Sequence, residues 1–315
     1  MAPKQSGIGQ SHGKIILLGE HAVVYNYPSI AIPFPKTSIQ TIVKKAIQEP
    51  TISCDFYTGL LGDMPELLDS LKEAIHLSLK TLNQESYPLD ITINSSIPAE
   101  RGMGSSAAVA VATIRGIFDY FDVSLTQEKL LDLVNTSEKI AHGNPSGLDA
   151  LMTSSSTPYY FKKGQMEVPL HMMLNAYLVV ADTGETGQTK EAVESISHKL
   201  KGNTKEHTLA LIHTLGSLPD KGRIALESDR AKELGSYMSQ AHQILKELGV
   251  SSPSLDRLVD AAMTHGALGA KLTGGGRGGC MIALAIDKKS AHEIAQTLKD
   301  FGAKQTWVYE MSDHL

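Results

Sequence analysis

One short segment, Gly102-Met103-Gly104-Ser105-Ser106-Ala107-Ala108, constrains the fold more than any other. It stands between residues 89–94, whose alternating apolar pattern predicts a strand, and residues 105–120, whose Ala-rich pattern predicts a buried helix. Its two glycines let the backbone turn and approach a ligand closely. The first turn of the helix offers free N–H groups at the positive end of the helix dipole. The segment therefore predicts a phosphate-binding loop, called the phosphate loop below.

Three other interpretations of the phosphate loop fit its sequence less well or stay open. The pattern GxxxxGK[ST] is absent, so the chain is not a P-loop NTPase. Gly102, Gly104 and Ala107 match the dinucleotide fingerprint GxGxxG/A, but about eight residues separate the strand from the first glycine, which is a poor context. A plain serine-capped helix after a glycine turn stays open.

Composition argues against several classes of function. The net charge is -5 and no dense basic patch occurs, which argues against nucleic acid as a partner. Cys54 and Cys280 are the two cysteines and lie far apart, so a disulfide framework or a zinc cluster is not expected. The first apolar stretch, residues 15–18, is too short for a signal sequence or a membrane span. We therefore expect a cytoplasmic protein that neither binds nucleic acid nor crosses a membrane.

The predicted elements follow a different order in the two halves of the chain. In the first half, strands are expected at 14–18, 38–43 and 89–94, and helices at 65–82, 105–120, 126–141 and from Pro145, after the cap Asn144. In the second half, a strand at 176–181 precedes three or four helices between about 189 and 265, a glycine-rich turn, a strand at 281–286, a helix at 290–301 and a strand at 305–309. This second order resembles a split βαβ sandwich with an inserted helical bundle. A domain boundary is expected between residues 155 and 175.

Charged residues flank the first apolar strand. Lys14 begins this strand, and Gly19-Glu20-His21 ends it. A lysine on so short an apolar strand is unusual unless it is paired or lies at an edge. From the residues alone, Lys14 and His21 could also be ordinary surface side chains.

The segment from Glu138 to Asp149 is the richest in candidate chemistry. Glu138 and His142 share a helix face, and Asp149 is expected in the second turn of the next helix. Two carboxylates on either side of a sharp corner can serve a metal ion and a substrate hydroxyl separately. A helix–turn–helix corner with solvated acids stays open as the alternative.

A second glycine-rich segment lies near the C-terminus, with five glycines in the six residues 274–279. It also matches GxGxxG, but a strand follows it instead of a helix, so the dinucleotide-binding context fails. Ordering so flexible a segment costs conformational entropy, which favours a loop that approaches a ligand. A simple hairpin turn stays open.

Together these segments resemble the GHMP kinase superfamily, which includes galactokinase, homoserine kinase, mevalonate kinase and phosphomevalonate kinase. Its members carry an N-terminal strand, a PxxxGLGSSAA loop and a C-terminal glycine loop, and all three occur here in order. Residues 19–25 (GEHAVVY) and 142–149 (HGNPSGLD) are most similar to the mevalonate kinase family. The resemblance implies an α+β fold: a ribosomal-protein-S5-domain-2-like domain at residues 1–165, and a ferredoxin-like split βαβ domain with inserted helices at residues 166–315.

The resemblance also implies an ATP-dependent phosphotransferase of the mevalonate pathway of isoprenoid biosynthesis, with mevalonate as substrate and Mg²⁺ as metal ion. Asp149 would act on the C5 hydroxyl as base or charge stabiliser, with Lys14 beside it, and Ser106 and Glu138 would hold Mg²⁺. Contacts with ATP are implied at Pro98, Gly102, Met103, Gly104, Ser105, Ser106 and Ala107. Contacts at or near the substrate are implied at Glu20, His21, Ser146, Thr189, Gly274, Gly275 and Gly276. Relatives are often dimers, so a homodimer is expected.

Three positions depart from the family pattern. Met103 replaces the usual leucine, which conserves side-chain volume. Gly187 stands about where some members carry an arginine near the substrate, so that contact is in doubt. Arg277 interrupts the last glycine loop, where it could either reach phosphate or point to solvent.

The sequence leaves two alternatives to this function open. A phosphomevalonate kinase or another small-molecule kinase of the superfamily is the alternative among enzymes. A catalytically silent ligand sensor on the same fold is the alternative from a different class. A nicotinamide-dependent enzyme fails on the context of both glycine motifs.

Overall fold

The computed structural model describes residues 3–142 and 146–312, which pack as two compact units. The first unit comprises Met1–Lys14, Thr37–Ala99 and Gly104–Ser155, and the second comprises Ile15–Lys36, Glu100–Met103 and Ser156–Leu315. The division into residues 1–165 and 166–315 that the sequence favours stays a prediction.

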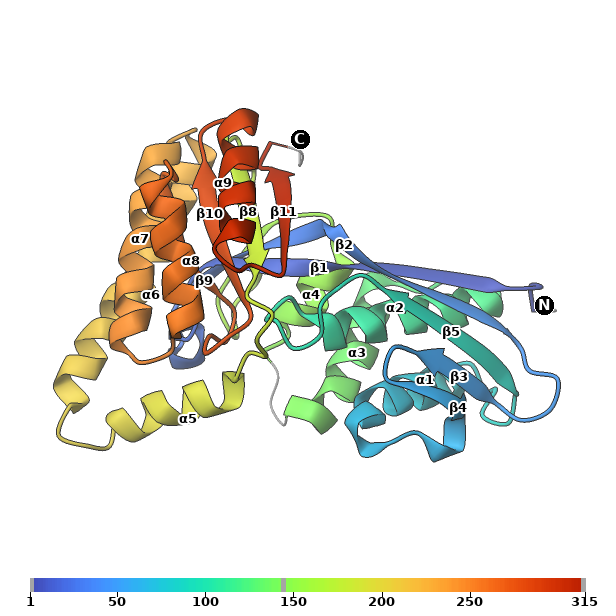
Figure 1. Cartoon of the computed structure of the whole chain (residues 1–315). Coiled ribbons are helices and arrows are strands. Elements are labelled where there is room, and N and C mark those ends of the chain that lie inside the picture. The colour runs from blue at the N-terminus through green and yellow to red at the C-terminus, as the bar shows by residue number, and fades with distance from the viewer. Residues whose placement is uncertain (1–2, 143–145, 313–315) are drawn as a thin grey trace. The chain divides into compact units, whose positions relative to one another are not determined.

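The first unit combines a sheet with a group of helices. Its strands are β1 (Gly7–Leu18), β2 (Ser29–Lys45), β3 (Thr51–Cys54), β4 (Tyr57–Leu60) and β5 (Leu89–Ser95), of which β1 and β2 continue into the second unit. Its helices are α1 (Asp69–Thr81), α2 (Ser105–Tyr120), α3 (Gln127–His142) and α4 (Leu148–Ser154), with 3-10 turns at Leu61–Asp63 and Glu66–Leu68. The strand order is β4-β3-β5-β2, and β1 pairs with β2. Helices α1, α2 and α3 contact one another and lie side by side (Figure 1).

Two glycines bring β1 directly onto α2. A Cβ atom at Gly7 or Gly9 would collide with the helix backbone at Gly116 and Ala112. The alternate residues Gly7, Gly9 and Ser11 are buried, so this face of the strand is closed by contact with the helix. The close approach fixes the course of β1 up to Lys14.

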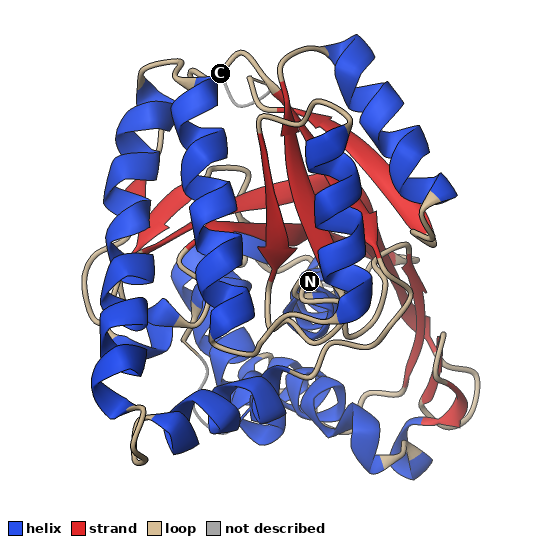
Figure 2. Cartoon of the chain, turned by 60° about the vertical axis from the view of Figure 1, so that its left-hand side comes forward, coloured by secondary structure: helices blue, strands red, loops and turns tan. Residues whose placement is uncertain are grey.

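The second unit is built on a four-stranded antiparallel sheet in the order β11-β8-β10-β9. Its strands are β8 (Tyr177–Asp182), β9 (Gly269–Thr273), β10 (Cys280–Ala285) and β11 (Gln305–Glu310). The short strand β6 (Tyr159–Phe161) pairs with β2, β7 (Val168–Pro169) pairs with β6, and the 3-10 turn η1 (Ala22–Tyr25) follows β1. Its helices are α5 (Thr189–Lys199), α6 (Lys205–Glu227), α7 (Ala231–Glu247), α8 (Pro253–Thr264) and α9 (Lys288–Asp300). Figure 2 shows the long helices beside the strands. This order confirms the ferredoxin-like split βαβ arrangement with inserted helices.

Helix α4 differs from the expectation. It begins at Leu148, with Gly147 at φ 85° as its cap, so Asp149 lies in the first turn and not in the second. Asn144 and Pro145, the expected cap and first helical residue, lie outside the described residues. Within the described part of the chain, no helix is both long enough and apolar enough to cross a membrane.

Candidate active site

Lys14 and Asp149, the residues expected to carry catalysis, meet in the first unit. Lys14 Nζ lies 3.1 Å from Asp149 Oδ1. The side chain of Lys14 is 4% exposed, whereas that of Asp149 is 48% exposed. A buried ammonium group therefore holds a carboxylate that solutes can reach, which suits the orientation of a substrate hydroxyl.

The helix N-terminus at the phosphate loop carries no serine cap. Helix α2 begins at Ser105, and its cap residue is Gly104, at φ 72°, without a side-chain hydrogen bond. A Cβ atom at Gly104 would lie 3.0 Å from Lys14 Cγ, so the lysine packs directly against the loop. The N–H groups of the first turn can hold a phosphate. Lys14 thus contacts both the helix end at Gly104 and Asp149.

Ser106 and Glu138, the expected metal ligands, are also in contact. Ser106 donates a hydrogen bond to Glu138 Oε1 at 2.6 Å, and Ser70 of α1 donates to the same oxygen at 2.9 Å. Glu138 is only 4% exposed. Among the residues that the structure describes, no group of three or more His, Cys, Asp or Glu side chains could hold a metal ion. One carboxylate and one hydroxyl fit Mg²⁺, which keeps several water and phosphate ligands of its own.

The second unit brings the two glycine-rich segments together. A Cβ atom at Gly102 would lie 3.1 Å from Gly274 Cα, and one at Gly274 would lie 2.8 Å from Gly102 Cα. Both residues also have positive φ, at 77° and 81°. The close approach of the two backbones and the left-handed conformation therefore each require glycine. Thr189, the first residue of α5, packs against Gly275. The start of the phosphate loop, the second glycine loop (residues 274–279) and Thr189 therefore form one cluster.

Glu20 is deeply buried, in an ion pair that the sequence did not reveal. Its carboxylate pairs with Lys271 Nζ, and the two side chains are 1% and 0% exposed. Lys271 also donates to the carbonyl of Leu272 at 2.7 Å. Burial lowers the pKa of Lys271, and the neighbouring Glu20 carboxylate opposes that lowering. The pair links the segment just after β1 to strand β9, which immediately precedes the second glycine loop.

His21 contacts the second glycine loop itself. Its Nε2 lies 3.0 Å from the carbonyl oxygen of Gly275, and because a carbonyl only accepts, Nε2 is the protonated nitrogen. Burial lowers the pKa of His21 to about 4, so the ring is neutral near pH 7. Its Nδ1 is buried and has no hydrogen-bond partner among the described residues. In this neutral ring Nδ1 is therefore a hydrogen-bond acceptor.

The remaining predicted residues are described by their burial and their hydrogen bonds. Met103 and Ala107 are buried, at 0% and 1% exposure. Pro98 is half-buried between β5 and α2, and exposed Ser146 accepts a hydrogen bond from the Leu148 N–H. Arg277 donates from Nε to the Gly249 carbonyl at 3.3 Å, so part of its guanidinium is used within the second unit.

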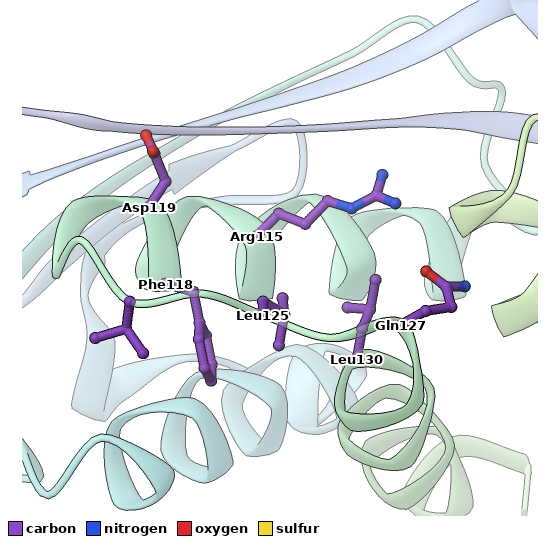
Figure 3. A pocket seen from close by; sticks show the side chains of 7 residues that line it. Arg115, Phe118, Asp119, Leu125, Gln127 and Leu130 are labelled. Atoms are coloured by element: carbon purple, nitrogen blue, oxygen red, sulfur yellow. The ribbon is translucent and has the colours of Figure 1, made fainter.

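A surface pocket of about 230 Å³ lies elsewhere in the first unit, between α2 and the start of α3 (Figure 3). Phe118 forms part of its apolar wall, and Arg115 and Asp119 are its charged groups. Arg115 donates to two backbone carbonyls, and Asp119 pairs with Lys4. Both charges are engaged within the protein, and the pocket contains none of the predicted site residues.

Comparisons with known proteins identify the family of this chain. Residues 69–156 match the family model of the GHMP kinases N terminal domain, and residues 223–304 match that of the GHMP kinases C terminal domain. The mevalonate kinase of Thermococcus sibiricus is 35% identical over 94% of this chain and 93% of its own length. That of Pyrococcus horikoshii is 34% identical over 94% of this chain and 92% of its own.

Solved structures give the same result. The crystal structure of mevalonate kinase from methicillin-resistant Staphylococcus aureus matches with a TM-score of 0.75 and 32% identity, covering 98% of this chain and 100% of that one. The structure of L. major mevalonate kinase in complex with R-mevalonate matches with a TM-score of 0.82 and 25% identity, covering 99% of both chains. The chain therefore belongs to the GHMP kinases, and within them to the mevalonate kinase family.

Proposed function

We propose that this chain transfers the γ-phosphoryl group of ATP to the C5 hydroxyl of mevalonate, giving 5-phosphomevalonate and ADP. The contact that carries the proposal is that of Lys14 Nζ with Asp149 Oδ1 at 3.1 Å. It lies beside the helix end at Gly104, which no side chain caps. Direct phosphoryl transfer needs a carboxylate for the acceptor hydroxyl, a cation beside it and a helix N-terminus that binds phosphate. We place the reaction in the cytoplasm and propose a homodimer.

Asp149 is the residue that acts on the acceptor. Its carboxylate orients the C5 hydroxyl and takes the proton late, as the oxygen–phosphorus bond forms. Lys14 holds the carboxylate in place through the contact of its Nζ with Oδ1. The first-turn N–H groups of α2 stabilise the charge that develops on the phosphate oxygens.

Ser106 and Glu138 are the proposed metal ligands. Mg²⁺ bound there would neutralise charge on the β- and γ-phosphates. Ser70 orients Glu138 through its hydrogen bond to Oε1, as outer residues of metal sites commonly do.

The proposed substrate contacts belong to the second unit, apart from Ser146. His21 and Thr189 both lie against Gly275 of the second glycine loop. The proposal includes the neighbouring glycines 274 and 276. Glu20 supports this region through its ion pair with Lys271.

Glu138→Gln and Ser106→Ala should both raise the Mg²⁺ requirement. Loss of a ligand or of its charge should weaken metal binding by about 10–100-fold, the range seen when residues that support metal ligands are substituted. Mg²⁺ titrations of activity at fixed ATP measure this, with exposed Glu128→Gln on the same helix as the control. A titration curve that matches wild type in both variants contradicts the assignment.

Lys14→Met should lower kcat by about 100-fold or more, on the scale of losing one electrostatic group in an active site. Methionine keeps the packing against Gly104 but removes the charge beside Asp149. Calorimetric titration should show that ATP still binds. Exposed Lys44→Met is the matched control, and turnover unchanged by Lys14→Met removes this lysine from the site.

ADP release with mevalonate, phosphomevalonate, galactose and homoserine, each offered separately, tests the proposed function. ADP with mevalonate alone is the expected result. ADP with another acceptor instead identifies a sibling kinase. No ADP with any of the four favours a ligand sensor.

A further inference from the structure

Arg101 stands immediately before Gly102, and its guanidinium is engaged on three sides. Its Nε donates to Asp182 Oδ1 at 3.0 Å. Its terminal nitrogens donate to the Gly184 carbonyl at 2.9 Å and to the Thr186 hydroxyl at 3.2 Å. The side chains of Arg101 and Asp182 are 13% and 4% exposed, so the ion pair is shielded from water and strengthened by that shielding.

The backbone of residues 100–103 is also held in place. The Gly187 N–H donates to the Glu100 carbonyl at 2.9 Å. Gly102 lies against Gly274, as described above. Residues 100–103 are thus fixed on one side by the loop that follows β8, and on the other by the second glycine loop.

These contacts are needed because residues 100–104 have an unfavourable backbone conformation. Glu100 has φ 57°, Gly102 has φ 77° and Gly104 has φ 72°, so three residues out of five are left-handed. A non-glycine residue such as Glu100 costs about 1–2 kcal/mol in that region. Such conformations persist only where the surrounding structure determines them, and Arg101 supplies the polar side chain that does so here.

We propose that Arg101 is a positioning residue for the phosphate loop. It fixes residues 100–103 on the end of β8 and the loop after it, and so holds the left-handed backbone at Glu100 and Gly102 from which the phosphate loop starts. It does not touch the reacting atoms. The inference rests on the proposed kinase function, and it concerns ATP more than the acceptor.

The test compares Arg101→Ala and Arg101→Lys with wild type. For Arg101→Ala we expect the KM for ATP to rise by about 10–100-fold, the scale of effects from small displacements in an active site, and the KM for mevalonate to change much less. Arg101→Lys should recover little, because an ammonium group cannot reach three acceptors in the fixed plane of a guanidinium. Added guanidinium ion should restore part of the ATP affinity of Arg101→Ala. The control is Arg230→Ala, which removes an exposed pair with Glu233 in the same unit.

The outcomes separate this inference from the proposed function. Calorimetric titration with ATP needs no acceptor, so weaker ATP binding by Arg101→Ala supports the positioning role even if mevalonate is not the substrate. Unchanged ATP affinity overturns the inference, and so does a loss of stability that lowers all kinetic parameters equally and is not rescued by guanidinium. If Arg101→Ala does not fold, Thr186→Ala removes one of the three bonds and keeps the Asp182 pair. It should then weaken ATP binding by about 3–10-fold, and wild-type affinity in that variant overturns the inference.

Discussion

Asp149→Asn should lower kcat by about 100- to 10,000-fold, the range for loss of a positioned general base. The amide keeps the shape of the carboxylate but cannot accept the hydroxyl proton. Because Asp149 is 48% exposed, its own burial contributes little to folding, although Lys14 loses its counter-ion. Steady-state kinetics at saturating ATP and mevalonate measure the effect, and thermal unfolding checks that the variant is folded.

The matched control for this variant is Asp132→Asn, an exposed acid on α3 that pairs with Lys129. It makes the same chemical change away from Lys14 and should leave kcat within about twofold, as expected for a surface substitution. Near-normal turnover in Asp149→Asn contradicts the assignment of Asp149 as the residue that takes the proton.

Breaking the buried pair of Glu20 and Lys271 should destabilise the protein by about 3–5 kcal/mol, the range for removing one partner of a buried ion pair. Glu20→Gln leaves the Lys271 ammonium group, at 0% exposure, without its carboxylate. The Leu272 carbonyl remains as an acceptor but carries no full charge. Urea unfolding followed by circular dichroism measures the change. The exposed pair Lys289–Glu293 is the control, where Lys289→Met should cost less than about 1 kcal/mol.

A double-mutant cycle tests the cause of this effect. The double variant Glu20→Gln, Lys271→Met removes both charges, so it should be less destabilised than the sum of the two single variants. Additive losses would mean that packing, and not the uncompensated charge, accounts for the result.

The parts of the fold that the sequence predicted are those with a local signal. The phosphate loop and helix α2 follow from adjacent strand, glycine and helix patterns in one short stretch. The succession of β8, the inserted helices, β10, α9 and β11 agrees with the predicted order of elements, and few topologies accommodate that order. Strand β9, which completes the sheet order β11-β8-β10-β9, had no predicted range. The meeting of Lys14 with Asp149 came only from the family resemblance, since no local pattern joins residues so far apart.

Strand β1 shows why a period-2 pattern can escape notice. Residues 7–13 alternate between buried and exposed positions, yet the buried positions hold Gly7, Gly9 and Ser11 instead of apolar side chains. Gly7 and Gly9 are buried by contact with α2, and Ser11 donates to the Thr153 carbonyl of α4, neither of which the sequence of the strand encodes. The prediction therefore began at residue 14 and missed the first half of the strand.

Arg101 and Lys271 were missed for a related reason. Each is a charged residue whose burial depends on a carboxylate far away in the sequence, Asp182 and Glu20. A lysine in the buried strand β9 is a signal that could have been used, because such a residue is almost never buried unless it is paired. Nothing local, however, identifies its partner.

Phosphorus NMR of the reaction products tests the central claim most directly, with wild type and Asp149→Asn run in parallel on MgATP and mevalonate. The account predicts equal amounts of ADP and 5-phosphomevalonate from wild type, and only traces of both from the variant. Phosphate on another acceptor but not on the C5 oxygen of mevalonate, or equal product from both proteins, would contradict it.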